Sequence, residues 1–236
     1  HDQVVCDDDH IEEAMSAGFI NMRIQPTLGY GYVAVNHNNE IFKDVKVRQA
    51  LLHAIDRKSL NQAVYGQYAI TLNIPQAPIS WLYDDEGLDK YEYDLEKAEA
   101  LLKEAGWEKD GDKLMKDGKQ MKIVFSAMSG NVVTDNMIPL MIDAYGQLGI
   151  DFQAEYVDWP TLQSKSQNGT FDMLFMAWGL TADPDITGTF ASPEAGGSKN
   201  HTGYSNPELD KMLGEALSSV SKEEQKENYK EIYKLI

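Results

Sequence analysis

The sequence predicts an α/β fold in which a mixed, mainly parallel sheet is flanked by helices. Three observations lead to this prediction. Residues 121–178 alternate strand, helix, strand, helix and strand patterns, which is typical of two right-handed βαβ crossovers. Several amphipathic segments begin at a capping residue and end at a glycine, as helices do. The 236 residues are 42% hydrophobic and 25% charged, which is an ordinary globular composition.

The elements of the first half follow from capping residues and apolar spacing. Residues 30–36, YGYVAVN, alternate loosely and predict a strand. The next helix has one apolar face, formed by Val47, Ala50, Leu51, Ala54 and Ile55. Residues 67–93 contain two prolines and several aromatic residues and predict a long loop. Aspartates are predicted to cap three helices, and glycines to end two of them: Asp44, Asp56 and Asp94 as caps, Gly66 and Gly106 as stops.

The second half begins with a hairpin, whose loop contains KDGDK or KDGKQ, because Asp-Gly pairs suit tight turns. Three strands and two helices follow in alternation: strand 121–128, a helix from about Thr134 to Leu148, strand 150–157, a helix from the cap Asp158 through Asn168, and strand 173–178. Asn206 before Pro207, and Ser221 with Glu224, predict the starts of the last two helices.

Charge and terminal sequence restrict the class of protein. The formal net charge of −17 argues against binding to nucleic acid or to anionic lipid, since both need basic surfaces. The single cysteine, Cys6, excludes an intrachain disulfide, and no run of 18 apolar residues could span a membrane. The chain starts without methionine or a signal peptide and ends within a helical pattern, so we expect a piece of a longer protein.

Motifs for catalysis or for metal binding are missing from the sequence. It has no G-x-S-x-G, H-E-x-x-H, C-x-x-C or G-x-x-x-x-G-K motif, and its five histidines lack metal-ligand spacing. Asp110-Gly111-Asp112 resembles the start of a calcium loop but lacks the later ligands, so a turn is favoured. Asp183 and Asp185 are too close in sequence to flank a glycosidic bond. We expect no enzymatic activity and no cofactor.

The stretch FDMLFMAWGLTADPDITGTF, residues 171–190, combines a buried strand with a polar loop. The strand ends at Trp178, and Asp183-Pro184-Asp185 follow in the loop. In open α/β sheets, ligands bind at the carboxyl ends of the strands, so these side chains are candidates for a ligand site. The alternative is that Trp178 belongs to the core and that the aspartates only solvate a turn.

Four segments together resemble a known family: YVAVNHNNEIFKDVKVRQALLHAIDR (32–57), YDLEKAEALLKEAGW (93–107), FDMLFMAWGLTADPD (171–185) and GYSNPELDKML (203–213). They are similar to extracellular solute-binding proteins that feed oligopeptide, dipeptide and nickel ABC importers. The resemblance implies a lobe of the type II periplasmic-binding-protein-like fold. Residues 1–35 would cross the hinge, and residues 36–236 would form the C-terminal ligand-binding lobe, truncated before the chain returns to the other lobe.

The same resemblance implies a set of ligand-binding residues. Peptide-binding members carry W-x-x-D after this strand, and its aspartate receives the peptide ammonium group. Here the stretch is Trp178-Gly179-Leu180-Thr181, so the acid is absent at that place. The resemblance carries Trp178 and the backbone of Gly179, Leu180 and Thr181 over as cleft wall. It assigns the ammonium to a later acid of the loop, Asp183, which is followed by Asp185, and it places Asn200 near the same wall. Tyr30 and Tyr32 approach the hinge and are candidates to face the ligand. For the two tyrosines, packing of the strand on the core is the alternative.

The resemblance also implies function, partners and location. The protein would capture oligopeptides or dipeptides outside the cell, as a monomer, and deliver them to the membrane permease subunits of an ABC importer. A nickel chelate or another small solute on the same scaffold is the alternative. The location would be the periplasm, or the outer face of the cell membrane with a lipid anchor. The anchor and the signal peptide would lie in an N-terminal part that this chain lacks.

Overall fold

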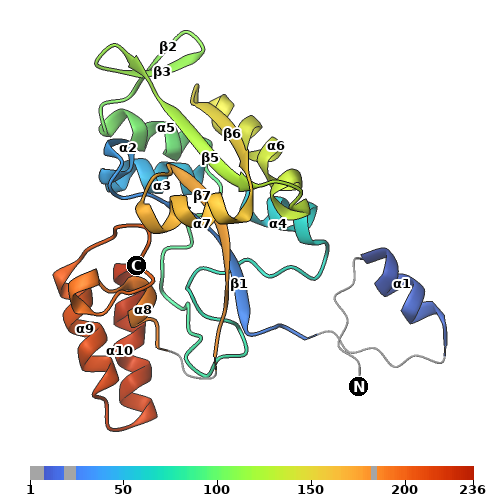
Figure 1. The fold of residues 1–236 in the computed structure, drawn as a ribbon, viewed down its shortest axis with the longest axis vertical. Helices are drawn as coiled ribbons and strands as arrows, with labels where there is room; N and C mark the ends of the chain where they lie inside the picture. Colours follow the sequence, from blue (N-terminus) through green and yellow to red (C-terminus); the bar gives the residue numbers. More distant parts are fainter. Residues whose placement is uncertain (1–7, 19–24, 182–184) are drawn as a thin grey trace.

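A four-stranded mixed sheet forms the centre of the fold (Figure 1). The computed structural model describes residues 8–18, 25–181 and 185–236. The strands are β1 (Gly29–Val35), β5 (Lys122–Met128), β6 (Asp151–Val157) and β7 (Met173–Gly179). Their order is β1-β7-β5-β6, with β5 parallel to both neighbours and β1 antiparallel to β7. The predicted mixed, mainly parallel sheet is therefore confirmed.

The two crossover helices cover opposite faces of this sheet. α6 (Val132–Gln147) joins β5 to β6, and α7 (Trp159–Asn168) joins β6 to β7. Met141 of α6 packs in the large core with Ile123 and Phe125 of β5, whereas Leu162 of α7 packs with Leu174 on the other face. α6 begins two residues before the predicted Thr134, because the side chain of Asn131 accepts hydrogen bonds from the first backbone amides of the helix.

Four helices share the α6 face: α2 (Glu40–Lys43), α3 (Val45–His53), α4 (Arg57–Tyr65) and α5 (Leu95–Glu104). The side chains of Asp44, Asp56 and Asp94 accept hydrogen bonds from amides of α3, α4 and α5, so the three predicted caps are confirmed. The one-turn helix α2 was not predicted, because four residues are too few to show an apolar period. Residues 67–93 contain no helix or strand, as predicted.

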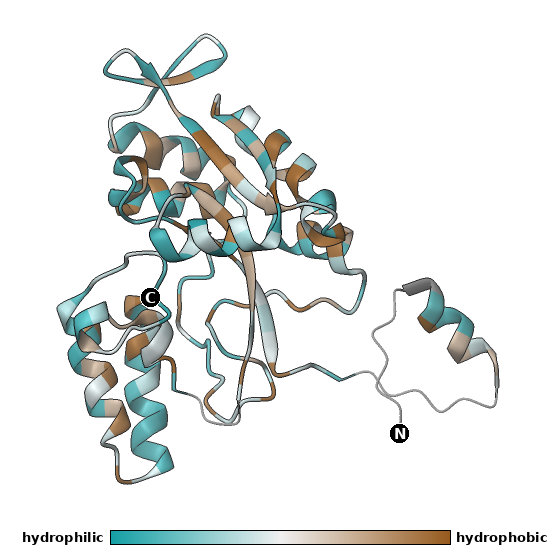
Figure 2. Cartoon of the chain, viewed as in Figure 1, coloured by the Kyte–Doolittle hydropathy of each residue, from teal (hydrophilic) through white to brown (hydrophobic). Residues whose placement is uncertain are grey.

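A small sheet of three strands directly precedes the amino end of β5. Its strands are β2 (Glu108–Asp110), β3 (Lys113–Lys116) and β4 (Lys119–Gln120). The sequence predicted one hairpin around one of the two Asp-Gly pairs. Both pairs form turns instead, and Asp117 and Gly118 have φ values of 52° and 75°, which suit a tight two-residue turn. Figure 2 shows this sheet largely in the hydrophilic colour, in contrast to β5 and β7.

A second core lies at the other end of the molecule. It is built by α9 (Pro207–Leu217), α10 (Lys222–Leu235) and buried side chains of the long loop such as Ile74 and Leu82. The short helix α8 (Thr187–Phe190) and a 3₁₀ turn (Pro193–Ala195) connect β7 to this core. Asn206 and Ser221 cap α9 and α10, as predicted. The N-terminal helix α1 (Asp8–Ser16) stands apart from both cores in Figure 1.

Candidate functional site

The carboxyl end of β7 extends past its neighbour β5 and leaves a two-stranded ribbon with β1. β5 pairs with β7 only at Phe125↔Met173 and Ser126↔Leu174, whereas β1 pairs with β7 along its whole length, from Val35↔Met173 to Gly29↔Gly179. We call residues 29–33 of β1 and 175–179 of β7 the β1–β7 ribbon. In Figure 1 this ribbon descends from the main sheet toward the level of α8, α9 and α10. The predicted site residues of both strands lie on it.

One face of the β1–β7 ribbon is aromatic. Tyr30 lies opposite Trp178, and Tyr32 opposite Met176, so these side chains project from the same face. The rings of Tyr30 and Tyr32 are 5.9 Å apart between centroids, and Tyr32 stacks on Trp178 at 6.1 Å with a 10° angle between the ring planes. Each of the three rings is only partly buried. The structure therefore brings together three residues that the sequence placed in the candidate site.

The tyrosines of this face are less acidic than free tyrosine. Burial raises the pKa of Tyr32 to about 12, with a smaller opposite contribution from the Trp178 indole. Burial also raises the pKa of Tyr30, and the neighbouring Tyr32 adds to the effect. Both phenols are therefore neutral at physiological pH and offer hydroxyl groups. Tyr32 packs at the edge of the core under α7, which agrees with the alternative interpretation made from the sequence. That either tyrosine faces a ligand stays a prediction.

The opposite long edge of β7 is open at the ribbon. The amide of Leu180 donates to the carbonyl of Leu28 at 2.9 Å, so the backbone groups of Leu180 face β1. Backbone groups of successive strand residues alternate in direction, which turns those of Gly179 away from β1. On that side, no strand of the described chain pairs with β7 beyond Leu174. The edge at Gly179 can therefore accept hydrogen bonds from another extended backbone and donate to it.

The other predicted residues lie at different distances from the ribbon. Thr181 is exposed and lies two residues after the end of the ribbon. Asp183 lies outside the described residues, so its assigned role stays a prediction. Asp185 is exposed, and its Oδ1 accepts a hydrogen bond from the amide of Thr187 at 2.8 Å, at the start of α8. Its carboxylate thus bonds to the first residue of α8.

Asn200 holds its own loop together. Its Nδ2 donates to the carbonyl oxygens of Ala191 and Tyr204 at 2.9 and 2.7 Å, and its Oδ1 accepts from Thr202 Oγ1 at 2.9 Å. These bonds occupy its amide group with contacts inside the segment that follows α8. We infer that Asn200 shapes the wall near the site and does not itself present the amide to a ligand.

Sequence reasoning missed one charged residue, Lys199. Its ammonium nitrogen lies 5.7 Å from the centroid of the Trp178 ring, within the range of a cation–π contact. The only signal in the sequence was its position before Asn200 in KNHTGY. The contact itself could not be predicted, because Lys199 and Trp178 are 21 positions apart in the sequence. The site thus carries a cation on the aromatic face.

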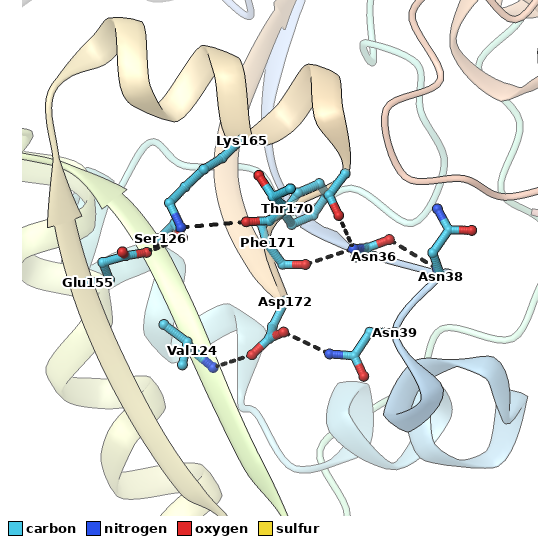
Figure 3. Close-up of a pocket in the computed structure, with 11 residues that line it drawn as sticks. Asn36, Asn38, Asn39, Val124, Ser126, Glu155, Lys165, Thr170, Phe171 and Asp172 are labelled. Carbon is cyan, nitrogen blue, oxygen red and sulfur yellow. Dashed lines mark hydrogen bonds and ion pairs between the residues drawn. The ribbon is translucent and has the colours of Figure 1, made fainter.

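A separate open pocket of about 550 Å³ lies against the sheet near the end of α7 (Figure 3). Asp172 dominates its floor. Its two carboxylate oxygens accept from Asn39 Nδ2 at 2.7 Å and from the Val124 amide at 2.9 Å. The side-chain Nδ2 of Asn36 donates to the carbonyl oxygens of Gly169 and Phe171, just before β7, both at 2.8 Å. These bonds tie the loop after β1 to the first residues of β7.

A second cluster of polar side chains lines another part of this pocket. Lys165 Nζ lies 2.8 Å from Glu155 Oε2, and Ser126 Oγ donates to the same oxygen at 3.0 Å. Within each of the two clusters, the polar side chains thus have partners in the protein. We interpret this pocket as a bracing network that fixes β7 in the sheet, and the β1–β7 ribbon as the candidate site.

Within residues 8–18, 25–181 and 185–236, no three His, Cys, Asp or Glu side chains are grouped so that they could hold a metal ion. Over the same part of the chain, no helix has the length and apolar character to cross a membrane.

Residues 4–199 match the family model described as bacterial extracellular solute-binding proteins, family 5, middle region. The chain belongs to this family. The resemblance seen in the sequence is thereby confirmed. Family 5 consists of solute-binding proteins and not of enzymes, which agrees with the expectation of no catalysis.

Relatives of this family 5 chain differ in the solutes that their names state. Oligopeptide-binding protein AppA of Bacillus subtilis (strain 168) is 34% identical over 225 residues, which cover 92% of this chain and 41% of AppA. The structure of AppA with a nonapeptide matches with a TM-score of 0.85 and 32% identity, over 90% of this chain and 43% of that one. NikZ of Campylobacter jejuni, in complex with Ni(L-His), matches with a TM-score of 0.83 and 26% identity, over 97% and 46%.

The family 5 chain spans about two fifths of the length of the curated relatives that it matches. The similarity to the AppA structure confirms the α/β fold of a periplasmic-binding-protein lobe.

Proposed function

We propose that this chain is the C-terminal lobe of an extracellular solute-binding protein that captures oligopeptides or dipeptides and delivers them to the permease subunits of an ABC importer. Residues 1–35 would cross the hinge, and residues 36–236 would form the lobe. The mature protein would work as a monomer, either in the periplasm or on the outer face of the membrane with a lipid anchor. The extracellular description of the family supports the location.

The observation that carries this proposal is the open edge of β7 at Gly179, beside the aromatic face. An extended peptide can add to such an edge as a further strand, with main-chain hydrogen bonds for affinity and side-chain pockets for selectivity. Recognition of the backbone suits a protein that accepts many peptide sequences. The neutral rings of Tyr30, Tyr32 and Trp178 offer apolar contact area to the peptide side chains next to that edge.

The relatives support a peptide as the solute. AppA, 34% identical to this chain, is an oligopeptide-binding protein, and its structure holds a nonapeptide. Because this chain matches only 41% of AppA, the peptide would also contact a second lobe that closes over it. We expect the isolated chain to bind peptide at least about a thousandfold more weakly than the full-length protein, since the entropy cost of capture is not halved with the contacts.

A nickel chelate is the second candidate, and the match to NikZ with Ni(L-His) favours it. The described residues hold no group of three metal ligands, so the metal ligands would come from the chelator or from parts of the protein outside the described residues. Binding would then depend on the aromatic wall and not on the backbone edge.

Calorimetry on the full-length protein that contains this chain tests the proposal. Alanine peptides of two to nine residues should bind, should be recovered chemically unchanged, and should raise the melting temperature. Ni²⁺ with L-histidine should bind more weakly than the best of these peptides. Binding of the nickel complex without binding of any peptide would contradict the proposal and support the second candidate.

A further inference from the structure

Lys199 is held in place at the aromatic face by its backbone. Its amide donates to the carbonyl of Gly188 in α8 at 2.7 Å, which fixes the base of the exposed side chain. The ammonium group reaches the ring of Trp178, which in turn stacks on Tyr32. Trp178 directly precedes Gly179 in β7, so the ammonium lies on the aromatic face of the ribbon, over the residue before the open position.

The ammonium group of Lys199 keeps its capacity to bind an anion. Among the described residues, no carboxylate lies within ion-pair distance of it, although the chain carries 38 acidic residues against 21 basic ones. Some lysines of the described chain do pair, for example Lys165 with Glu155 and Lys46 with Glu104, and others, such as the control residue Lys222, do not. An ammonium has three N–H donors, and the face of one ring engages at most part of them. Donors therefore remain for a group that enters the site.

We propose that Lys199 determines specificity in the peptide site by binding a carboxylate of the ligand, which is either the C-terminal carboxylate or an acidic side chain of the peptide. This inference rests on the proposed function and names the chemistry of one end of the ligand. A carboxylate is the partner that an ammonium binds most strongly among peptide groups, through charge-assisted hydrogen bonds. A basic side chain at the same place would be repelled.

The position of Lys199 on the aromatic face allows it to meet a group of a peptide that is bound along β7. A peptide added along β7 at Gly179 presents its backbone to the edge and alternate side chains to the aromatic face. A carboxylate on that face would approach the side of the ammonium that the indole ring leaves free.

The test uses four alanine tetrapeptide probes and calorimetry on the full-length protein. The probes are the free acid, its C-terminal amide, the amide with one internal glutamate, and the same amide with glutamine. The variant Lys199→Met keeps a flexible side chain over the ring and removes only the charge, whereas Lys199→Arg keeps the charge. The control is Lys222→Met, because Lys222 makes the same kind of contact with Trp81, at 5.2 Å, at the start of α10.

We expect Lys199→Met to weaken binding of the carboxylate-bearing probe by about tenfold to a hundredfold. Loss confined to the free acid identifies the C-terminal carboxylate, and loss confined to the glutamate probe identifies an acidic side chain. Lys199→Arg should retain most of the affinity, and Lys222→Met should change none of the four values. Thermal unfolding checks that each variant is folded.

Two results would contradict the inference, and they differ in what they leave standing. If the wild-type protein binds the probes and Lys199→Met changes all four affinities equally or not at all, Lys199 recognises no carboxylate, and the proposed function still holds. If the wild-type protein binds none of the four probes, the proposed function fails and the inference fails with it.

Discussion

Replacing Gly179 with proline should weaken peptide binding while leaving the fold intact. The backbone of Gly179 faces the open edge of β7, so its N–H makes no bond to β1 that proline would remove. A Cβ atom built at Gly179 meets no atom within 4 Å, so a side chain can start there without a clash. Proline is tolerated on strand edges for this reason. The substitution thus removes one donor that only a bound peptide would use.

The size of the effect follows from the loss of one backbone hydrogen bond. Such a bond contributes about 1 kcal/mol net, which corresponds to about a fivefold increase in Kd. Gly179→Ala keeps the N–H and should bind within about twofold of the wild type. Leu180→Pro removes the donor of the 2.9 Å bond to Leu28 instead, so it should lower the stability of the β1–β7 ribbon by about 1 kcal/mol or more.

Calorimetry with tetra-alanine on the full-length variants measures the affinities, and urea unfolding measures the stabilities. The decisive comparison is between proline and alanine at position 179. Equal affinities for these two variants, with both proteins folded, would refute the claim that the peptide backbone bonds to this edge.

Three further perturbations test the frame and the polar loop. Asp172→Ala leaves two donors without an acceptor and should cost about 2 kcal/mol in urea unfolding, while Asp172→Asn should cost less because it keeps one acceptor. Burial, and next the nearby Arg48, lower the pKa of His37 to about 4. Because the unfolded value is about 6.5, the unfolded chain binds this proton first, and stability should fall as the pH drops from about 6.5 to 4. Thermal unfolding should show that fall reduced in His37→Asn. Asp183→Asn should weaken peptide binding by about 1.5–3 kcal/mol in calorimetry, and Asp185→Asn by less, because Asp185 bonds to its own loop.

The elements that sequence reasoning found are those whose signals are local. Asp44, Asp56, Asp94 and Asp158 were predicted as caps because a capping side chain bonds to amides two or three residues away. The βαβ pattern followed from apolar runs separated by amphipathic helices. The errors are also local: α2 is too short to show a period, and α6 begins at a cap, Asn131, that stands before two valines.

The candidate site was only partly predictable, because its contacts join distant segments. Trp178 stood out as the aromatic residue at the end of an apolar run, and Tyr30 and Tyr32 as part of a strand. The pairing of these strands, the overhang beyond β5 and the approach of Lys199 depend on the tertiary fold. The bracing role of Asp172 also needed the structure, since its two donors come from segments 48 and 133 residues away.

Amide hydrogen exchange at Gly179 tests the central claim most directly. In the free full-length protein this amide should exchange quickly, because it faces an open edge, and saturating tetra-alanine should slow it markedly. The amide of Leu180, which already bonds to Leu28, serves as the internal reference and should change little. Unchanged exchange at Gly179 in the peptide-saturated protein would contradict the account, since the proposed peptide strand bonds to β7 at that amide.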